Sequence, residues 1–223
     1  AQLRANIFND TANFKIVTTS SNQLGNATLN GKAFAADDYF HLIFKPSEFF
    51  LSNTRWQVES GNETIFGKDY VDIQNFVLNS GQQSIKINHL GSTTPNEAKI
   101  TFKNIGVNAV NDFIPNDSLN FYGNLSGTAL VKPLMSKQVA TFDLKIDSLR
   151  LNKDTMGVMN LVGKFDVPST TLHFDKGSGL TYGDSKLFME GKWNFNTAIA
   201  NGVNGVIRLS DTKLSLAQPF LYS

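Results

Sequence analysis

Apolar and polar residues alternate along most of this chain, and the alternation is most regular between Asn124 and Phe165. Successive side chains of a β-strand point to opposite faces of the sheet, so alternation sorts them into two sets. Within this stretch, the apolar set is Ala140, Phe142, Leu144 and Ile146, and the polar set is Thr141, Asp143, Lys145 and Asp147. The pattern predicts a sheet with one polar face and one face suited to an apolar neighbour.

Similar short runs, separated by turn residues, predict strands along nearly the whole chain. Asn30-Gly31 is a strong hairpin signal, and Pro46 and Pro95 are expected to interrupt strands. The pattern therefore favours a long antiparallel meander. The predicted strands are residues 14–18, 27–29, 39–44, 49–51, 56–58, 64–66, 71–78, 84–88, 99–102, 119–131, 139–151, 156–165, 171–174, 180–182, 187–195, 205–209 and 212–216.

One segment departs from the strand pattern. Apolar residues from Val107 to Ile114 recur at spacings of three and four, Asn108 can cap a first turn, and Pro115 ends the run. This predicts a short amphipathic helix over residues 108–114 against the apolar face of the sheet. A single helical turn within a loop is the alternative.

The alternation also slips by one residue at two places, Asp147-Ser148 and the neighbourhood of Asn75. A β-bulge or tight turn explains such a slip, and bulges bend sheets. A repeatedly bent antiparallel sheet tends to curl around its apolar face into a sandwich, a barrel or an open groove. The predicted fold is all-β: a long curled antiparallel sheet with one short helix, formed by residues 1–223 as a single β-rich segment.

Composition narrows the classes of function. The net charge of +1 provides no basic field for a nucleic-acid backbone, so nucleic acid is not expected as a partner. The absence of cysteine removes disulfides, thiol catalysis and thiolate metal sites. No apolar run approaches the roughly 20 residues of a membrane-spanning helix, so no transmembrane segment is expected. The Ala-Gln start favours an excised piece of a longer protein.

No catalytic constellation is apparent in the sequence. His41, His89 and His173 are far apart and lack metal-ligand spacing, so they are expected to be exposed strand or loop residues. Asp143 and Asp147 share a face with Lys145 between them, which indicates charge balance on a solvated surface. We expect no enzymatic activity, no cofactor and no metal.

The stretch from Gly123 to Asn152 resembles the repeat of TamB-like proteins of the AsmA-like superfamily. In that repeat, a strand with alternating Gly and apolar positions leads through a short loop to a strand ending in L-x-L-N. The matching positions are Gly123, Leu125, Gly127, Ala129 and Val131, then Ala140, Phe142, Leu144, Leu149, Leu151 and Asn152. Upstream, the spacing around Ile43, Pro46, Trp56, Phe66, Ile73, Phe76 and Leu78 is similar to versions found in the Bacteroidota. The chain departs from the family's L-G-D-L-like turn at residues 156–159.

The resemblance implies a β-groove that carries phospholipid acyl chains across the periplasm, within a protein anchored in the inner membrane. It also implies an outer-membrane barrel partner, met through regions outside this chain. Each methylene moved onto an apolar lining gains about 0.8 kcal/mol, so no sharp site is needed. The expected lining residues are Ile100, Phe102, Leu119, Phe121, Leu125, Ala129, Val131, Ala140, Phe142, Leu144, Ile146, Leu149, Leu151, Met189, Trp193, Ile207 and Leu209.

Three alternatives remain open at this point. Alternating strands more commonly fill a closed sandwich core than line a groove. Exposed sheet edges could instead pair with client strands, as in an assembly factor for outer-membrane proteins. Trp56 and Trp193 could form a stacking platform on a carbohydrate-binding sandwich, although Trp193 shares its predicted face with Leu187 and Met189.

Overall fold

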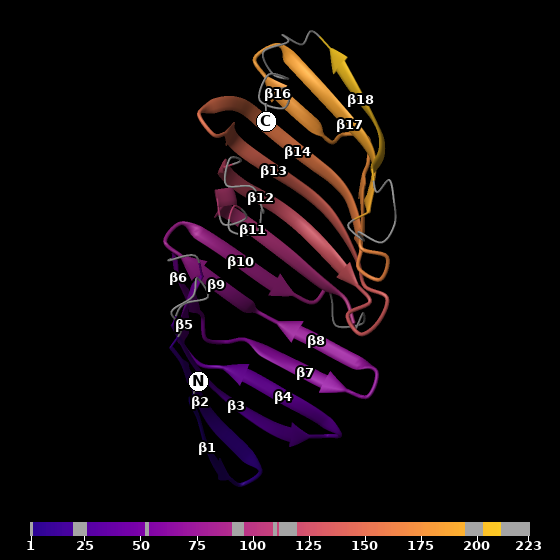
Figure 1. Ribbon diagram of the computed structural model, residues 1–223. Helices are drawn as coiled ribbons and strands as arrows, with labels where there is room; N and C mark the ends of the chain where they lie inside the picture. The colour runs from indigo at the N-terminus through magenta and orange to yellow at the C-terminus, as the bar shows by residue number, and fades with distance from the viewer. Residues whose placement is uncertain are drawn as a thin grey trace. The chain divides into compact units, whose positions relative to one another are not determined.

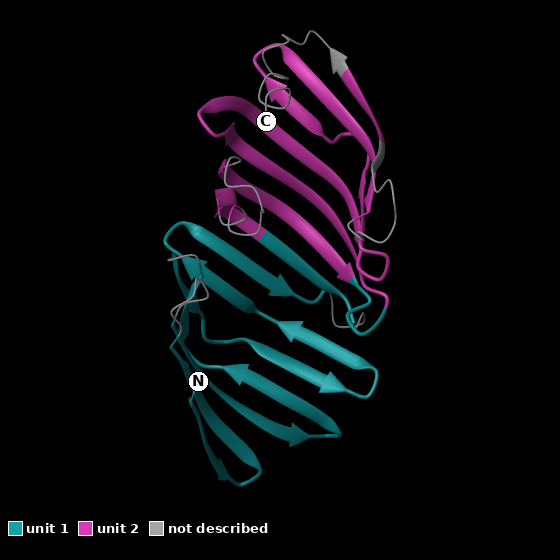
Figure 2. Ribbon diagram, viewed as in Figure 1, with its two compact units in different colours: residues 1–101, 132–136 teal, residues 102–131, 137–223 magenta. Residues whose placement is uncertain are grey.

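The computed structural model describes residues 2–19, 26–51, 54–90, 96–108, 111, 120–194 and 203–210. These residues form eighteen strands, and every strand pairing with a defined register is antiparallel (Figure 1). The predicted all-β, antiparallel fold is confirmed. Two compact units divide the chain, residues 1–101 with 132–136 and residues 102–131 with 137–223 (Figure 2). The expectation of a single segment over residues 1–223 stays a prediction beside this division.

The first unit is built from short strands. They are β1 (Gln2–Phe8), β2 (Thr11–Thr18), β3 (Ala27–Ala36), β4 (Tyr39–Phe44), β5 (Ser47–Leu51), β6 (Thr54–Val58), β7 (Glu63–Gly67), β8 (Tyr70–Gln74), β9 (Phe76–Ser80), β10 (Gln83–Asn88) and the beginning of β11 (Ala98–Gly106). β1, β2 and β3 pair in order, and β3 then pairs with both β4 and β5. β7 and β8 continue from β4, while β6, β9 and β10 continue from β5. Consecutive short strands therefore lie end to end as interrupted long strands.

Tight two-residue turns join several of these strands. Asn9-Asp10 connects β1 to β2, and Asp37-Asp38 connects β3 to β4, all four residues having φ between 46° and 66°. Positive φ at both turn residues is the geometry that matches the twist of an antiparallel pair. The predicted turn at Asn30-Gly31 is wrong, because both residues lie within β3. There Gly31 is buried beneath the Phe14 ring, which leaves no room for a Cβ.

Side chains hydrogen-bond to the backbone at the interruptions between end-to-end strands. Between β4 and β5, the Ser47 hydroxyl accepts the Asn30 N–H at 2.8 Å and lies 3.2 Å from the Asn30 carbonyl. Between β6 and β7, Asn62 accepts the Phe44 N–H at 2.9 Å and donates to the Phe44 carbonyl at 2.9 Å. Ser47 and Asn62 are 6% and 2% exposed. Each side chain takes the place of a backbone partner that the interruption removes.

The second unit has longer strands. They are the rest of β11, then β12 (Phe121–Lys132), β13 (Val139–Leu151), β14 (Asp154–Asp166), β15 (Thr171–Phe174), β16 (Gly179–Tyr182), β17 (Ser185–Asn194) and β18 (Val203–Ser210). β13 pairs with β14, which pairs with both β15 and β16, and these pair with β17. β17 also pairs with β18. Between β15 and β16, the buried Ser178 hydroxyl bonds the N–H and carbonyl of Val162 at 2.9 and 2.8 Å.

The two predicted slips in alternation are confirmed. The register of β13 shifts between Ile146 and Leu149, where Ser148 has φ 54°. Asn75 has φ 49° and separates β8 from β9, and its N–H donates to the Asn88 side chain at 2.6 Å. Both slips therefore occur where one residue leaves the regular pleat.

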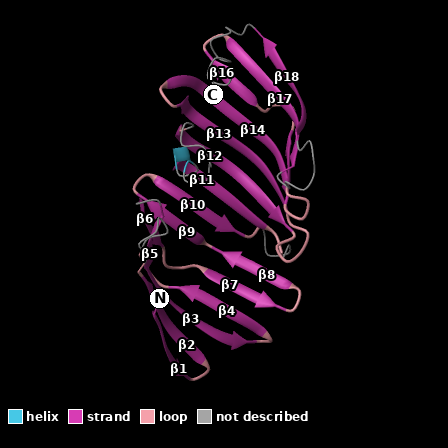
Figure 3. Cartoon of the chain, viewed as in Figure 1, coloured by secondary structure: helices cyan, strands magenta, loops and turns pink. Residues whose placement is uncertain are grey.

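The predicted helix over residues 108–114 lies mostly outside the described residues. Val107, Asn108 and Asn111 are described and have 3₁₀-helical backbone (Figure 3). The Asn111 amide is held by Phe121, whose N–H it accepts at 2.8 Å and whose carbonyl it contacts at 3.0 Å. Val107 is 7% exposed and belongs to the apolar cluster of the second unit. Val107, which directly precedes the predicted helix, thus packs on the apolar face, and the packing of residues 108–114 stays a prediction.

Candidate apolar binding surface

In the second unit, strand registers place apolar residues in continuous rows across one face. Both rows run from β13 to β17. The first row is Ala140, Phe165, Leu172, Trp193, and the second is Ile146, Met159, Leu180, Leu187. Partners in a register share a face, so the alternation of single strands becomes one apolar surface.

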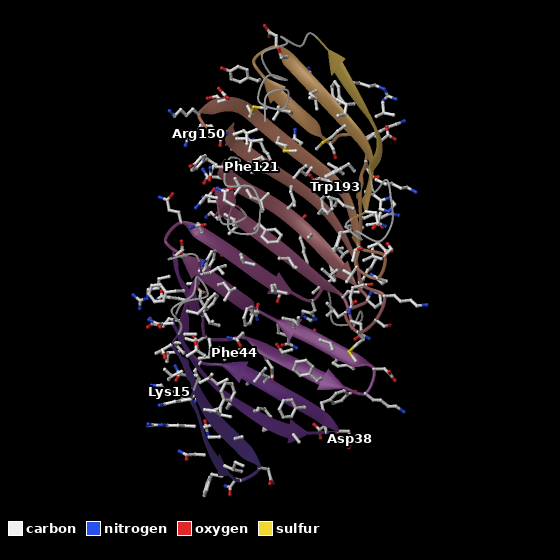
Figure 4. The ribbon with its side chains drawn as sticks, in the orientation of Figure 1. Lys15, Asp38, Phe44, Phe121, Arg150 and Trp193 are labelled. Atoms are coloured by element: carbon white, nitrogen blue, oxygen red, sulfur yellow. The ribbon has the colours of Figure 1, made fainter. Side chains whose placement is uncertain are left out.

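This surface is covered at one end and open at the other. The buried cluster consists of Val107, Ile146, Leu149, Leu151, Met156 and Leu180, each at most 8% exposed. Towards β18, in contrast, Trp193 is 47% and Ile207 68% exposed. Trp193 is labelled in Figure 4. An apolar ligand could contact the open end, whereas the buried cluster is packed as a small core.

The predicted lining residues fall into three groups. Ile146, Leu149 and Leu151 are buried in the cluster, where they act as core. Trp193 and Ile207 are exposed, and the half-buried members are Ile100, Phe102, Phe121, Leu125, Ala129, Val131, Ala140, Phe142, Leu144 and Met189. Leu119 and the Leu209 side chain lie outside the described residues. Ile100 belongs to the first unit and the others to the second, so each unit is considered separately.

Gly123 and Gly127 allow two strands of the second unit to lie close together. Gly127 on β12 has φ 138°, and a Cβ there would overlap the Asp143 carbonyl oxygen of β13. At Gly123 a Cβ would lie 2.9 Å from Ile146 Cγ2. These positions let β12 approach β13 closely, which only glycine permits.

The first unit carries its own apolar face. Of the predicted lining residues, only Ile100 belongs to this unit. Phe49 pairs with both Ala27 and Trp56, while Val58 pairs with both Ser47 and Leu78. The registers therefore bring apolar residues of β3, β5, β6 and β9 onto one face. On β1, Leu3 and Ile7 share this face and are 68% and 79% exposed.

An aromatic row crosses this face. The Phe14 and Phe44 rings meet edge-on with centroids 6.1 Å apart, and Phe44 meets Phe76 edge-on at 5.8 Å. Edge-to-face contacts at these distances are favourable for aromatic rings. Beside Phe44 lies an open recess of about 390 Å³, within the ~300–1,000 Å³ typical of small-molecule sites. All its lining residues are apolar: Ala27, Leu29, Phe44, Phe49, Phe50, Leu51, Val58, Phe76 and Leu78.

The sequence contained a signal for this recess. Phe44 precedes an interruption at Lys45-Pro46, and Phe49 and Leu51 resume the apolar set with opposite parity. Alternation alone predicts two separate short strands, one ending at Phe44 and one beginning at Phe49. Only the pairing of β3 with both β4 and β5 shows that they continue one apolar face.

The opposite faces of both units are largely polar. Lys145 Nζ lies 2.8 Å from Asp147 Oδ1, in agreement with the charge balance expected there. His41 Nδ1 lies 2.8 Å from Glu63, and His89 Nδ1 lies 3.0 Å from Asp72. The histidines are half-buried strand or strand-end residues, so the expectation that they are exposed is wrong. The contacts with Glu63 and Asp72 on neighbouring strands partly cover the side chains of His41 and His89.

The third histidine sits between two lysines. His173 pairs in register with Lys164 on β14 and with Lys192 on β17. Burial, together with the positive charges of these lysines, holds the pKa of His173 below its usual value. In the adjoining turn, hydrogen bonds from the Ser169 hydroxyl and N–H lower the pKa of Asp166. These shifts follow from local strand and turn contacts on the polar face.

In the part of the chain that the structure describes, no group of three or more His, Cys, Asp and Glu side chains could hold a metal ion. Nor does any helix in the described residues have the length and hydropathy needed to span a bilayer.

The chain matches no protein-family model, no curated protein and no solved structure in these three comparisons. The features of the chain that bear on its function are the apolar faces, their exposure and the recess beside Phe44.

Proposed function

We propose that this chain is a non-enzymatic β-groove segment whose apolar faces shelter phospholipid acyl chains. In this proposal it is part of a TamB-like envelope protein that moves lipid through the periplasm between the two membranes. One observation carries the proposal: in each unit, apolar side chains form continuous rows over one face, and part of that face is open. The sequence resemblance to TamB-like proteins supplies the biological setting.

The degree of burial favours an open face over a closed core. Among the described residues of the first unit, the buried apolar side chains are Trp56, Val58, Val71 and Ala98. A closed sandwich would bury the inward-facing residues of nearly every strand. Here most residues of the apolar rows are only half-buried, so they retain surface for a ligand.

The energetics suit a weakly held, mobile chain of methylenes. Each CH₂ that leaves water for an apolar surface contributes about 0.8 kcal/mol, so about ten such groups give micromolar affinity before ordering costs. Similar apolar contacts recur along the rows, so an acyl chain can shift by one strand without a large barrier. Uniform contacts favour passage along the surface over tight storage.

Neighbouring residues of β18 provide a matched test. Ile207 lies on the apolar face opposite Met189, and Val206 lies on the other face opposite Glu190. Both are well exposed, at 68% and 50%, so replacement should not disturb folding. A photoreactive amino acid at position 207 is expected to crosslink phospholipid in membrane-extract incubations, whereas the same group at 206 is not. Equal labelling at both positions, or no lipid at 207, would refute the groove.

The recess in the first unit allows an independent measurement. Trp56 is 5% exposed and pairs with Phe49, which lines the recess. In a Trp193→Phe background, Trp56 is the only tryptophan. Phospholipids brominated on the acyl chain should quench its fluorescence, and unbrominated lipids should not. The two tryptophans do not form a sugar platform, because Trp56 is buried.

Strand pairing is a second candidate function. β1 is exposed along its whole length, including Leu3, Ile7 and Phe8, and its defined register is with β2. An exposed apolar strand is a template for a client strand. Crosslinking from Ile7 to unfolded outer-membrane proteins, lost in an Ala5→Pro variant, would favour this function over lipid transfer.

A further inference from the structure

The polar face of the first unit has a marked segregation of charge. β1, β2, β3 and β4 contain Arg4, Lys15 and Lys32 but no Asp or Glu, and Lys45 follows β4 directly. The acidic residues of this region, Asp10, Asp37 and Asp38, lie in the two-residue turns. Four of the chain's 20 Lys and Arg residues thus lie on or directly beside four strands that contain no Asp or Glu.

Strand register brings three of these cations together. Arg4 lies directly opposite Lys15, and Lys15 lies opposite Asn30. The Lys45 N–H donates to the Asn30 carbonyl at 2.9 Å, which continues the row onto the next strand. Figure 4 labels Lys15, which extends away from the ribbon. The row therefore reads Arg4, Lys15, Asn30, Lys45 across the sheet.

These cations share one recess on the face opposite the apolar one. It has a volume of about 480 Å³, and the residues that line it are Arg4, Asn6, Asn13, Phe14, Lys15, Asn30, Gly31, Lys45 and Pro46. None of these lining residues carries a carboxylate. Glu48 on β5 is paired with Arg55 and so is already neutralised. Lys45 Nζ donates to Asn13 Oδ1 at 3.0 Å, which leaves the Asn13 amide nitrogen as a donor.

Such an arrangement is unfavourable without a ligand. Like charges directly opposite each other destabilise an antiparallel pair, and Arg4 and Lys15 form such a pair. A bound anion reverses the sign of this interaction. The guanidinium fork and the two ammonium groups match a phosphate group, which accepts charge-assisted hydrogen bonds from both kinds of donor.

We infer that the recess lined by Arg4, Lys15 and Lys45 binds a phosphate-bearing ligand. The phosphate can belong to a soluble phosphoester or to the headgroup of an anionic phospholipid, because both present the same oxygens. This inference does not depend on the acyl-chain function, since the recess lies on the other face of the sheet.

The experiment uses two probes on the whole chain. The first is inorganic phosphate, followed by chemical shifts in a ¹H–¹⁵N spectrum at low salt. The second is sedimentation with vesicles of pure phosphatidylcholine or of phosphatidylcholine mixed with phosphatidylglycerol. Arg4→Gln and Lys15→Gln should each weaken phosphate binding by about five- to tenfold, because each removes one charge-assisted contact.

The matched control is Lys86→Gln. Lys86 is an exposed strand lysine in the same unit, opposite Val77, and lies outside the recess. Its loss changes the net charge equally and should leave binding unchanged. Sedimentation with the phosphatidylglycerol vesicles alone identifies a headgroup source, and phosphate binding without sedimentation identifies a soluble ligand. Absence of binding to both probes, or equal weakening by Lys86→Gln, would overturn the inference.

Discussion

Asn62 is the sharpest test of how the interrupted strands hold together. Its side chain is 2% exposed and sits between β6 and β7. It accepts the Phe44 N–H at 2.9 Å and donates to the Phe44 carbonyl at 2.9 Å and the Glu59 carbonyl at 2.6 Å. Replacement by alanine removes all three hydrogen bonds and leaves the end of β4 without a lateral partner at this point.

The expected loss follows from these bonds. A hydrogen bond contributes about 1 kcal/mol net, so three give a loss of about 3 kcal/mol in the free energy of unfolding. Stranding a buried N–H and carbonyl adds to this, whereas water entering at the interruption subtracts from it. With a urea m-value of about 3 kcal/mol/M, the unfolding midpoint should fall by about 1 M.

Urea unfolding followed by Trp56 fluorescence in a Trp193→Phe background measures the change within the first unit. The control is Asn124→Ala, because Asn124 is an exposed strand residue on β12 and should change stability by less than about 0.5 kcal/mol. If Asn62→Ala unfolds at the same urea concentration as its parent, the hydrogen bonds that the Asn62 side chain makes at this interruption do not stabilise the fold.

The remaining predictions concern the second unit. Ser178→Ala should lower the free energy of unfolding by about 2 kcal/mol, because two hydrogen bonds to the Val162 backbone are lost. Ser178→Thr should also be destabilising although it keeps a hydroxyl, because the site has no exposed surface. Gly127→Val should prevent β12 from pairing and abolish the cooperative transition in circular dichroism, whereas Val introduced at the open turn residue Gly183 should be milder. For His173, burial and the flanking lysines lower the pKa in the folded state, so the unfolded state takes up the proton first as pH falls through about 6.5. The wild type should lose more stability between pH 7.5 and 5 than His173→Gln, and equal losses would contradict the shift.

Much of the fold could be predicted from alternation because each long strand carries a complete pattern. The slip in alternation at Asp147-Ser148 could be predicted because it lies within a single strand with apolar residues on both sides. Asn30-Gly31 misleads because local turn preference is overridden by tertiary packing: Phe14 covers Gly31, and Asn30 bonds Ser47. β1 was missed because the alternation of Leu3, Ala5 and Ile7 is short and its intervening residues are mostly polar.

The candidate site was only half predictable. All the expected lining residues except Ile100 belong to the second unit, where the buried end of the apolar surface is a core. The recess in the first unit depends on five separate strands meeting beside Phe44, and no single strand encodes that meeting. The basic recess likewise depends on the register of Arg4 with Lys15, which sequence spacing alone does not fix.

The interruptions between end-to-end strands also determine where the chain can change in length. A one-residue deletion within β13 would turn every following side chain of that strand to the opposite face. At Lys45-Pro46 and at Asn75 the parity of the apolar set already changes, and the apolar face nevertheless continues across the break. Insertions and deletions should therefore accumulate at these breaks as the sequence of such a sheet diverges. The side chains that hydrogen-bond to the backbone there, Ser47 and Asn88, and the lengths of the flanking strands should persist.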